Sequence, residues 1–395
     1  MPPFPPPPTS SIDWANVGFK VREVNGHISS TYSLQTQQWT SPEFVQSPFL
    51  PIHGFQPGLN YGQSAFEGLK AFRHPGDETI AIFRPDRNAK RMQNSVSYIA
   101  IPPVPEEHFL RCVRLAVALN AEFVPPHATG AAMYIRPLIF GSSAQLGLNP
   151  PEEYMFVVFV VPTGVYHGVS ANDALVLTNF DRCAPEGTGN AKIAGNYGPV
   201  LIHMEAARKQ GFGITLHLDS KTQSEIDEFS TCAFLGVRES KSEPKVTELV
   251  VPNSKNCIES VTAESVRQIA ERKFGCRAVE ESITLDKLDG FCEVIACGTA
   301  AALVPIKSIT LRKQGEAERK WTFDVGSDNG PGRWCKSFSD EYKQIQRGIK
   351  QDEYGWCDIV RAPEQYGHLS SKEEDSKSKA VNGMALKTAS AISVG

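Results

Sequence analysis

The sequence predicts a mixed α/β protein built from two domains. The chain has 395 residues, and at about 150 residues per domain this length gives two domains with room for a third. Short apolar runs of strand length occur along the chain together with apolar patterns of helical period. A Pro-Thr-Gly break at 162–164 follows a long apolar run. We therefore expect a smaller N-terminal domain at 14–161, a linker at 162–172 and a larger C-terminal domain at 173–362.

The first half predicts three strands and one helix. Residues 79–83 have a strand-like composition, and residues 109–123 place apolar side chains at helical spacing. Residues 133–140 predict a strand despite Pro137. The continuous apolar run at 154–161 has the length of a fully buried strand.

The second half continues the mixed pattern without an internal repeat. A helix at 199–210 has proline near its start and Gly211 after its end. A second helix opens at Thr262, with Glu264 in its first turn, and ends at Gly275. The expected strands are 174–179, a pair formed by 213–218 and 233–237, and 291–297.

The two ends of the chain predict disorder. Residues 1–13 are proline-rich and favour an extended, loosely attached segment. Residues 363–395 are mostly small, polar or charged and offer little to bury.

Composition excludes several function classes. A hydrophobic content of 41% and a charged content of 21% are ordinary for a globular protein, and no run reaches the length of a membrane span. The net charge of −4 gives no footprint for nucleic acid or an anionic membrane. The nine cysteines are scattered, without a C-x-x-C pair or zinc-site spacing, and indicate reduced thiols with no metal site. With no basic residue before Lys20 and no apolar leader, we expect a cytoplasmic protein.

The most informative segment is the loop at 187–199, which places Lys192 among four glycines, two alanines and a threonine. Little side-chain bulk surrounds this amine, so a flat ligand can approach the backbone there. A lysine in such a place can form a Schiff base with a carbonyl cofactor. The alternative interpretation is a glycine-rich surface loop whose lysine is incidental.

Four other segments suit a phosphate-bearing cofactor with a basic ring. The segment 82–91 ends in a basic cluster that includes Arg91, and an arginine fork can clamp a phosphate. Backbone amides of Val261 and Thr262 lie at a predicted helix N-terminus. The Gly298-Thr-Ala300 turn admits a ligand anion close to the backbone. The acidic stretch 224–231 offers a carboxylate for a protonated pyridine nitrogen. Each segment has an alternative interpretation. The basic cluster is then a solvated helix face, and the amides at 261–262 belong to a simple helix cap. The turn at 298–300 is an ordinary tight turn, and the acidic stretch is a surface turn.

Together these segments resemble the branched-chain-amino-acid aminotransferases, within the class IV, fold type IV enzymes that depend on pyridoxal 5'-phosphate. The resemblance extends from about residue 50 to about residue 310. Five segments carry it in family order: Tyr61-Gly-Gln-Ser-Ala-Phe-Glu-Gly-Leu-Lys-Ala-Phe-Arg73, Met133-Tyr-Ile-Arg-Pro-Leu138, the Lys192 loop with Gly195-Asn-Tyr197, the Glu228 segment and Gly298-Thr-Ala300. The resemblance implies a two-domain fold with the cofactor between the domains.

The resemblance also implies the role of each cofactor residue. Lys192 would hold pyridoxal phosphate as a Schiff base and then shuttle the proton. Glu228 would pair with the pyridinium nitrogen, and Tyr197 would hydrogen-bond the ring hydroxyl oxygen. The phosphate would be held by Arg91, the amides of Val261 and Thr262, and Thr299. Arg182 matches a basic position that lines the same site.

On the substrate side the resemblance implies a pocket with aromatic walls, Phe66 and Tyr166. Tyr134 and Arg136 match positions that recognise the distal carboxylate of glutamate, and the Thr299 and Ala300 amides would take the α-carboxylate. The reaction would be ping-pong, from a branched-chain or related hydrophobic L-amino acid to 2-oxoglutarate, in a homodimer whose subunits share the pocket.

Two departures from the family pattern bear on the substrate and on regulation. Ala233 stands where the family usually carries an asparagine, which favours a specialised amine donor, as in a secondary-metabolite pathway. The residues after Ala300 lack the C-x-x-C of some animal members, so no thiol switch is expected. The alternatives are another class IV enzyme (a D-amino-acid or amine transaminase, or a lyase) and a non-catalytic homologue.

Overall fold

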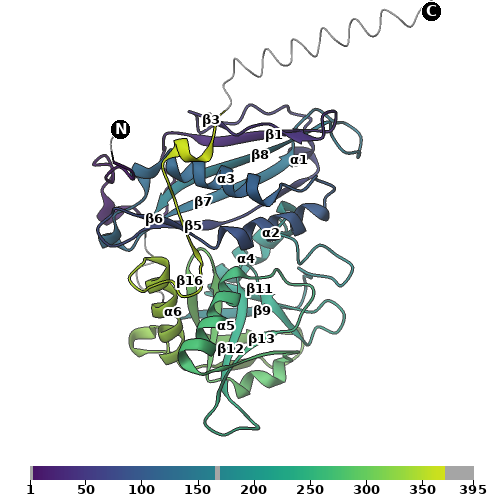
Figure 1. The fold of residues 1–395 in the computed structure, drawn as a ribbon. Helices are drawn as coiled ribbons and strands as arrows, with labels where there is room; N and C mark the ends of the chain where they lie inside the picture. The colour runs from purple at the N-terminus through teal and green to yellow at the C-terminus, as the bar shows by residue number, and fades with distance from the viewer. Residues whose placement is uncertain (1–2, 165–169, 370–395) are drawn as a thin grey trace, which may run out of the picture.

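The computed structural model describes residues 3–164 and 170–369, which form two nine-stranded sheets packed with helices. Figure 1 shows the first sheet in the upper half of the molecule and the second sheet in the lower half. This arrangement is the mixed α/β fold that the sequence predicts. Several apolar runs fall inside strands as expected. The run 154–161 forms a strand, but Met155, Phe159 and Val161 are only half-buried, so the expectation of a fully buried strand is wrong.

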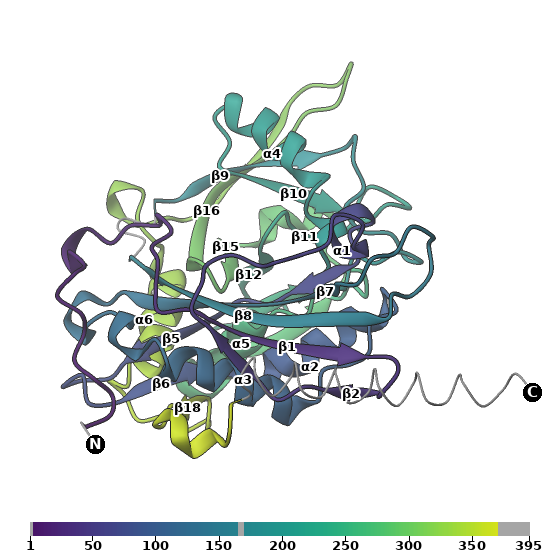
Figure 2. The same ribbon diagram turned by 90° about the horizontal axis from the view of Figure 1, so that it is seen from above.

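The first sheet is antiparallel, in the order β18-β6-β5-β7-β8-β1-β2, with β3 on β1 and β4 on β7. Helix α3 (Glu106–Ala118) runs along one face of β7 and β8, as Figure 2 shows, and its apolar side chains enter the core with those of α2 (Pro85–Ser97). Helix α1 (Pro57–Asn60) is a single turn. The strands are β1 (His27–Ser33), β2 (Gln38–Trp39), β3 (Glu43–Val45), β4 (Ser64–Phe66), β5 (Leu69–Arg73), β6 (Ile80–Phe83), β7 (Ala132–Gly141), β8 (Glu153–Thr163) and β18 (Cys357–Ile359).

The second sheet is mixed, in the order β11-β10-β9-β16-β15-β12-β13-β14, with β17 on β16. Helices α5 (Val261–Phe274) and α6 (Arg333–Gln346) pack on β15 and β16, and α4 (Val200–Lys209) packs on β10. The strands are β9 (Asn172–Leu177), β10 (Ile214–Leu218), β11 (Ile226–Phe229), β12 (Ala233–Glu239), β13 (Thr247–Pro252), β14 (Arg277–Glu281), β15 (Glu293–Gly298), β16 (Ala302–Leu311) and β17 (Arg319–Thr322).

The expected pairing of 213–218 with 233–237 is wrong. Strand β10 pairs with β9 and β11, whereas β12 pairs with β13 and β15. The missing partner is β11, which lies within the segment that the sequence suggests as an acidic turn. All four residues of this short strand are buried, but two of them, Asp227 and Glu228, are acidic. The strand therefore lacks the run of apolar residues by which a buried strand is recognised in a sequence.

The N-terminal segment makes defined contacts, contrary to the expected disorder of residues 1–13. Phe4 packs against the core of the first sheet. The Arg73 Nη2 donates to the Pro6 carbonyl at 2.6 Å, and the Thr9 amide donates to the Glu122 carbonyl at 2.8 Å. A buried guanidinium needs acceptors, and the extended proline-rich chain supplies a carbonyl for it.

The C-terminal segment returns to the first sheet. Strand β18 pairs with the edge strand β6, although its residues fall within the range expected for the C-terminal domain. Beyond it, a 3₁₀ turn at Pro363–Tyr366 lies on α3, where Arg111 Nε donates to the Tyr366 carbonyl at 2.7 Å. The expected disorder at 363–395 is therefore wrong for residues 363–369, and residues 370–395 lie outside the described part.

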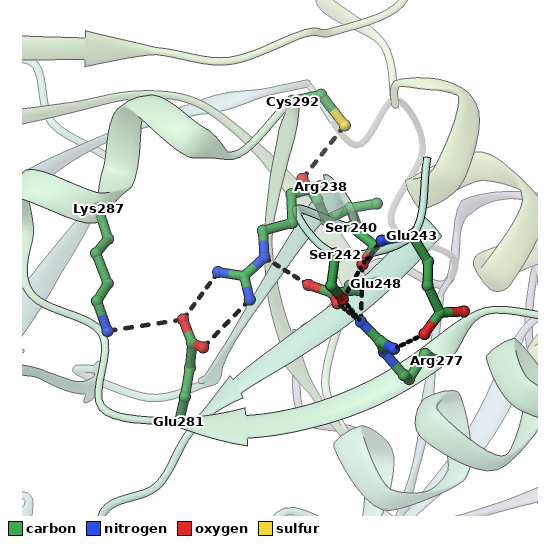
Figure 3. Close-up of polar contacts among 10 residues, drawn as sticks. Arg238, Ser240, Ser242, Glu243, Glu248, Arg277, Glu281, Lys287 and Cys292 are labelled. Atoms are coloured by element: carbon green, nitrogen blue, oxygen red, sulfur yellow. Dashed lines mark hydrogen bonds and ion pairs between the residues drawn. The ribbon is translucent and has the colours of Figure 1, made fainter. Parts of the chain in front are cut away.

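Two sets of polar contacts join elements across the molecule. Arg84, at the start of α2, donates to Ser265 Oγ at 2.7 Å and to Glu264 Oε1 at 2.8 Å, which fixes α2 against α5. A second network, drawn in Figure 3, links β12, β13 and β14 through Arg238 and Arg277. Arg238 pairs with Glu248 and Glu281, and Arg277 pairs with Glu248 and Glu243. This second network holds the edge strand β14 to its neighbours.

Candidate active site

A cavity of about 340 Å³ lies where the two sheets meet, and both contribute to its wall. With one exception, the site residues selected from the sequence line this cavity. The lining residues are Phe66, Arg91, Tyr134, Arg136, Arg182, Lys192, Tyr197, Glu228, Val261, Thr262, Thr299 and Ala300. The exception is Tyr166, which lies outside the described residues. The fold thus brings together residues that are up to 234 positions apart in the chain, from 66 to 300.

The backbone at Lys192 is clamped on both sides to the first sheet. Its amide donates to Ser95 Oγ on α2 at 2.9 Å, and its carbonyl accepts from the Phe66 amide at 3.1 Å. The next residue, Ile193, forms a bridge with Ala65 on β4. A lysine held by three backbone contacts has a fixed direction, so the loop is not an incidental surface loop.

The amine of Lys192 lies among two guanidinium groups, Arg91 and Arg136, and two carboxylates, Glu67 and Glu228. Its Nζ donates to Tyr197 Oη at 2.9 Å and lies 4.7 Å from the centre of the Phe66 ring. Burial lowers the pKa of the amine to about 8, and the positive charges of Arg91 and Arg136 act in the same direction. A lowered pKa raises the fraction of neutral, and therefore nucleophilic, amine near physiological pH.

Glu228 and Arg182 form a buried ion pair at the base of the cavity. Glu228 lies on β11, Arg182 lies in the loop before Lys192, and each is less than a tenth exposed. Burial raises the pKa of Glu228 to about 7, although the Arg182 guanidinium opposes that rise. Arg182 also donates to Cys183 Sγ at 3.1 Å. Arg182 therefore pairs with the Glu228 carboxylate. The motif alone did not specify this contact.

Arg91 faces the cavity from α2, and its guanidinium is held by Glu67. Arg91 Nε and Nη2 each donate to one carboxylate oxygen of Glu67 at 2.7 Å, and Nη1 donates to the Glu259 carbonyl at 2.9 Å. Glu67 is completely buried. The proximity of this carboxylate raises the pKa of Arg91 against the effect of burial, so the guanidinium stays charged.

The N-terminus of α5 supplies free backbone donors. Ser260, not Thr262, is the N-cap: its hydroxyl accepts from the Ala263 amide at 3.1 Å and its carbonyl accepts from the Glu264 amide at 2.9 Å. This capping uses the donors of the third and fourth helical residues. It leaves the Val261 and Thr262 amides, among the described residues, available to an anion on the cavity wall.

The Gly298-Thr-Ala300 turn connects β15 to β16 and lies opposite β5. Lys70 Nζ donates to the Ala300 carbonyl at 2.7 Å, which fixes this turn against the first sheet. Burial lowers the pKa of the Lys70 amine to about 8. Thr299 and Ala300 both line the cavity.

An aromatic wall carries one guanidinium at the opposite end of the cavity. Arg136 Nη2 donates to Tyr134 Oη at 2.9 Å, and its Cζ lies 5.0 Å from the centre of the Phe66 ring. Gly68 lets this tyrosine approach, since a Cβ at Gly68 would collide with the Tyr134 hydroxyl. The wall therefore combines an apolar surface with a cation at its rim.

Sequence reasoning missed four residues that hold the site: Glu67, Lys70, Ser95 and Cys183. Glu67 and Lys70 belong to the quoted 61–73 segment, where a carboxylate and an amine between apolar strand residues were an available signal. Ser95 and Cys183 carry no sequence signal, because their contacts come from distant parts of the chain.

The residues present fit pyridoxal phosphate. An amine with a lowered pKa, a buried carboxylate for a ring nitrogen and an anion cradle of one guanidinium and two free amides line one cavity. Within residues 3–164 and 170–369, no helix combines the length and apolar character needed to cross a bilayer. Nor does this part of the chain gather three or more His, Cys, Asp or Glu side chains as a candidate metal site.

Comparison with known proteins gives consistent matches. The family model for class IV amino-transferases matches residues 64–309. Aminotransferase atnJ of Emericella nidulans is 49% identical over 90% of this chain and 98% of that protein. The branched-chain amino acid aminotransferase gloG of Glarea lozoyensis is 45% identical over 91% of this chain and 99% of that protein. The solved branched-chain amino acid aminotransferase from Escherichia coli matches the fold with a TM-score of 0.66, at 23% identity, over 85% of this chain and 99% of that one.

Proposed function

Because this chain belongs to the class IV aminotransferases, which are transaminases dependent on pyridoxal 5'-phosphate, we propose that it moves the amino group of a branched-chain or related hydrophobic L-amino acid to 2-oxoglutarate. The observation that carries the substrate proposal is the guanidinium of Arg136 beside the Phe66 ring. One pocket then accepts an apolar side chain on its aromatic wall and a distal carboxylate at its rim.

Bound pyridoxal phosphate supplies an aldehyde for the amine of Lys192 and an electron sink for the substrate. Lys192 Nζ would be the point of attachment and, once freed, would take the proton from the substrate Cα. Its pKa of about 8 leaves a useful fraction neutral at physiological pH. The Tyr197 hydroxyl accepts from that amine at 2.9 Å, which orients it, and would donate to the ring oxygen of the cofactor.

The other residues hold charge where the cofactor carries it. The Glu228 carboxylate, kept in place by Arg182, pairs with the ring nitrogen. Arg91 and the Val261 and Thr262 amides bind the phosphate. The amides of Thr299 and Ala300 orient the α-carboxylate, so that the Cα proton faces the lysine.

A donor panel tests the substrate proposal. Purified enzyme is assayed with 2-oxoglutarate and, in turn, L-leucine, L-valine, D-alanine and an aromatic amine. We expect transfer from the branched-chain or other hydrophobic L-amino acids to be fastest. Faster transfer from D-alanine than from every L-amino acid would contradict the proposal and indicate a different class IV activity. Ala233 lines the cavity with a single methyl group. The panel also shows whether an enzyme with alanine at this position prefers an unusual amino donor.

We also propose that the enzyme is a homodimer. Three large apolar side chains, Phe49, Leu146 and Leu148, are more than three quarters exposed. The loops that carry them are joined by the Tyr61 hydroxyl, which donates to the Leu146 carbonyl, and by the Gln145 amide, which donates to the Phe55 carbonyl at 3.0 Å. Exposed apolar side chains held on ordered loops favour a protein interface. Light scattering after gel filtration should give twice the mass of the chain, and the mass of one chain would contradict the proposal.

A further inference from the structure

We propose, resting on the proposed function, that Glu67 is a positioning residue for the cofactor phosphate. Its carboxylate fixes the guanidinium of Arg91 so that the remaining N–H groups of the fork face the anion. Glu67 touches neither substrate nor cofactor in this account. It acts through Arg91.

The carboxylate of Glu67 is fully engaged within the chain. It lies between β4 and β5 with no exposed surface. Besides the two bonds from Arg91, Glu67 Oε2 accepts from Asn88 Nδ2 at 2.7 Å and from the Gly68 amide at 3.2 Å. These contacts and the Arg91 charge lower the pKa of Glu67 despite its burial. A carboxylate with four donors and a lowered pKa is unsuited to act as a proton acceptor in the reaction.

The number of donors on Arg91 defines what remains for a ligand. A guanidinium has five N–H groups. Glu67 accepts from Nε and from one N–H of Nη2, and the Glu259 carbonyl accepts from one N–H of Nη1. One N–H is left on each terminal nitrogen. These two donors of a rigid guanidinium can serve oxygens of a phosphate, provided that the guanidinium cannot rotate.

Two other roles of Glu67 give different outcomes when the charge is removed. If Glu67 only neutralises Arg91, its loss leaves a stronger positive potential and tightens the binding of an anion. If Glu67 acts mainly on Lys192, whose pKa its charge raises, its loss changes the capture of any aldehyde, with or without a phosphate. If Glu67 acts by orienting Arg91, its loss weakens the binding of the phosphate-bearing ligand alone.

The test compares two ligands on cofactor-free protein. The unaltered chain and Glu67→Gln are each titrated with pyridoxal phosphate and with pyridoxal, which lacks the phosphate, and binding is followed by absorbance. We expect Glu67→Gln to weaken pyridoxal phosphate binding about 10- to 100-fold, as is typical when a partner that orients a ligating group is lost. The affinity for pyridoxal should stay unchanged.

A matched control is Glu248→Gln. Glu248 is also a buried carboxylate held by arginines, Arg238 at 2.7 Å and Arg277, but it belongs to the network of β12, β13 and β14 and does not line this cavity. This variant should bind both ligands like the unaltered chain. A second variant, Glu67→Asp, keeps the charge and shortens its reach. It should show the same loss confined to pyridoxal phosphate, and it serves where Glu67→Gln does not fold.

Three results would overturn the inference: equal or tighter binding of pyridoxal phosphate by the Glu67 variants, an equal loss for both ligands, or a further loss when Glu67→Gln is added to Arg91→Ala. If the unaltered chain captures neither ligand, the proposed function itself fails. The failure of the inference alone is recognised by an unaltered chain that binds pyridoxal phosphate and a Glu67 variant that binds it equally well.

Discussion

Replacing Arg136 by leucine removes the cation to which we assign the binding of the distal carboxylate of 2-oxoglutarate in the proposed function. The guanidinium makes one hydrogen bond, to Tyr134 Oη at 2.9 Å, and lies over the Phe66 ring. Among the described residues no carboxylate pairs with it, and Arg136 lines the cavity. Leucine keeps an apolar contact with Phe66 and removes only the charge and the donors.

The magnitude follows from one charged hydrogen bond. Such a bond contributes about 1.5–3 kcal/mol, and about 1.4 kcal/mol corresponds to a tenfold change in rate. The variant should therefore lower kcat/KM for 2-oxoglutarate about 10- to 150-fold. For 4-methyl-2-oxopentanoate, which has no distal carboxylate, kcat/KM should stay within a factor of about two, since no interaction made by this substrate is removed.

The assay measures both acceptors with L-valine as the common donor. Tyr134→Phe is the control, because it keeps the guanidinium and removes only the oxygen that accepts from it. It should have a smaller effect with the same selectivity. An equal loss for both acceptors in Arg136→Leu, or an unchanged kcat/KM for 2-oxoglutarate, would refute the reasoning.

Three further predictions concern the cofactor residues. Lys192→Ala should lose turnover together with the absorption band of the lysine-bound cofactor; unchanged turnover would refute its role. Glu228→Gln leaves the buried Arg182 guanidinium without its carboxylate, so the free energy of unfolding should fall by about 3–5 kcal/mol in chemical denaturation and kcat should fall as well; full stability would show that the pair is not formed. The pKa of Lys192 is lowered to about 8, and only the neutral amine attacks an aldehyde. The rate of cofactor capture should therefore rise as the pH passes through about 8 and then level off. A rate that is constant from below to above this pH would contradict the assignment.

Local patterns predicted much of the fold. The helices α4 and α5 and the strands β7 and β8 begin and end within a few residues of the expected ranges, because caps, glycines and long apolar runs are local signals. Pairing between strands is not local. Strand β11 is short and carries the buried acids Asp227 and Glu228, so its pairing with β10 at the edge of the sheet was not visible in the sequence.

The motifs identified which residues belong to the candidate site, but they did not predict which of these residues contact one another. The residues that line the cavity come from motifs in family order, and the structure collects the described ones on one wall. The contacts between them depend on tertiary placement. Arg182 holds Glu228 across 46 positions, and Glu67 holds Arg91 across 24. No spacing rule predicts either pair, since each joins two elements whose relative position is set by the whole fold.

The central claim is that Lys192 carries the cofactor. Borohydride reduction of the holoenzyme fixes the cofactor to the lysine that holds it, and peptide mass mapping then identifies that residue. We expect a phosphopyridoxyl group on Lys192. The same group on Lys70, whose amine also has a pKa lowered to about 8, or on no lysine, would contradict this assignment.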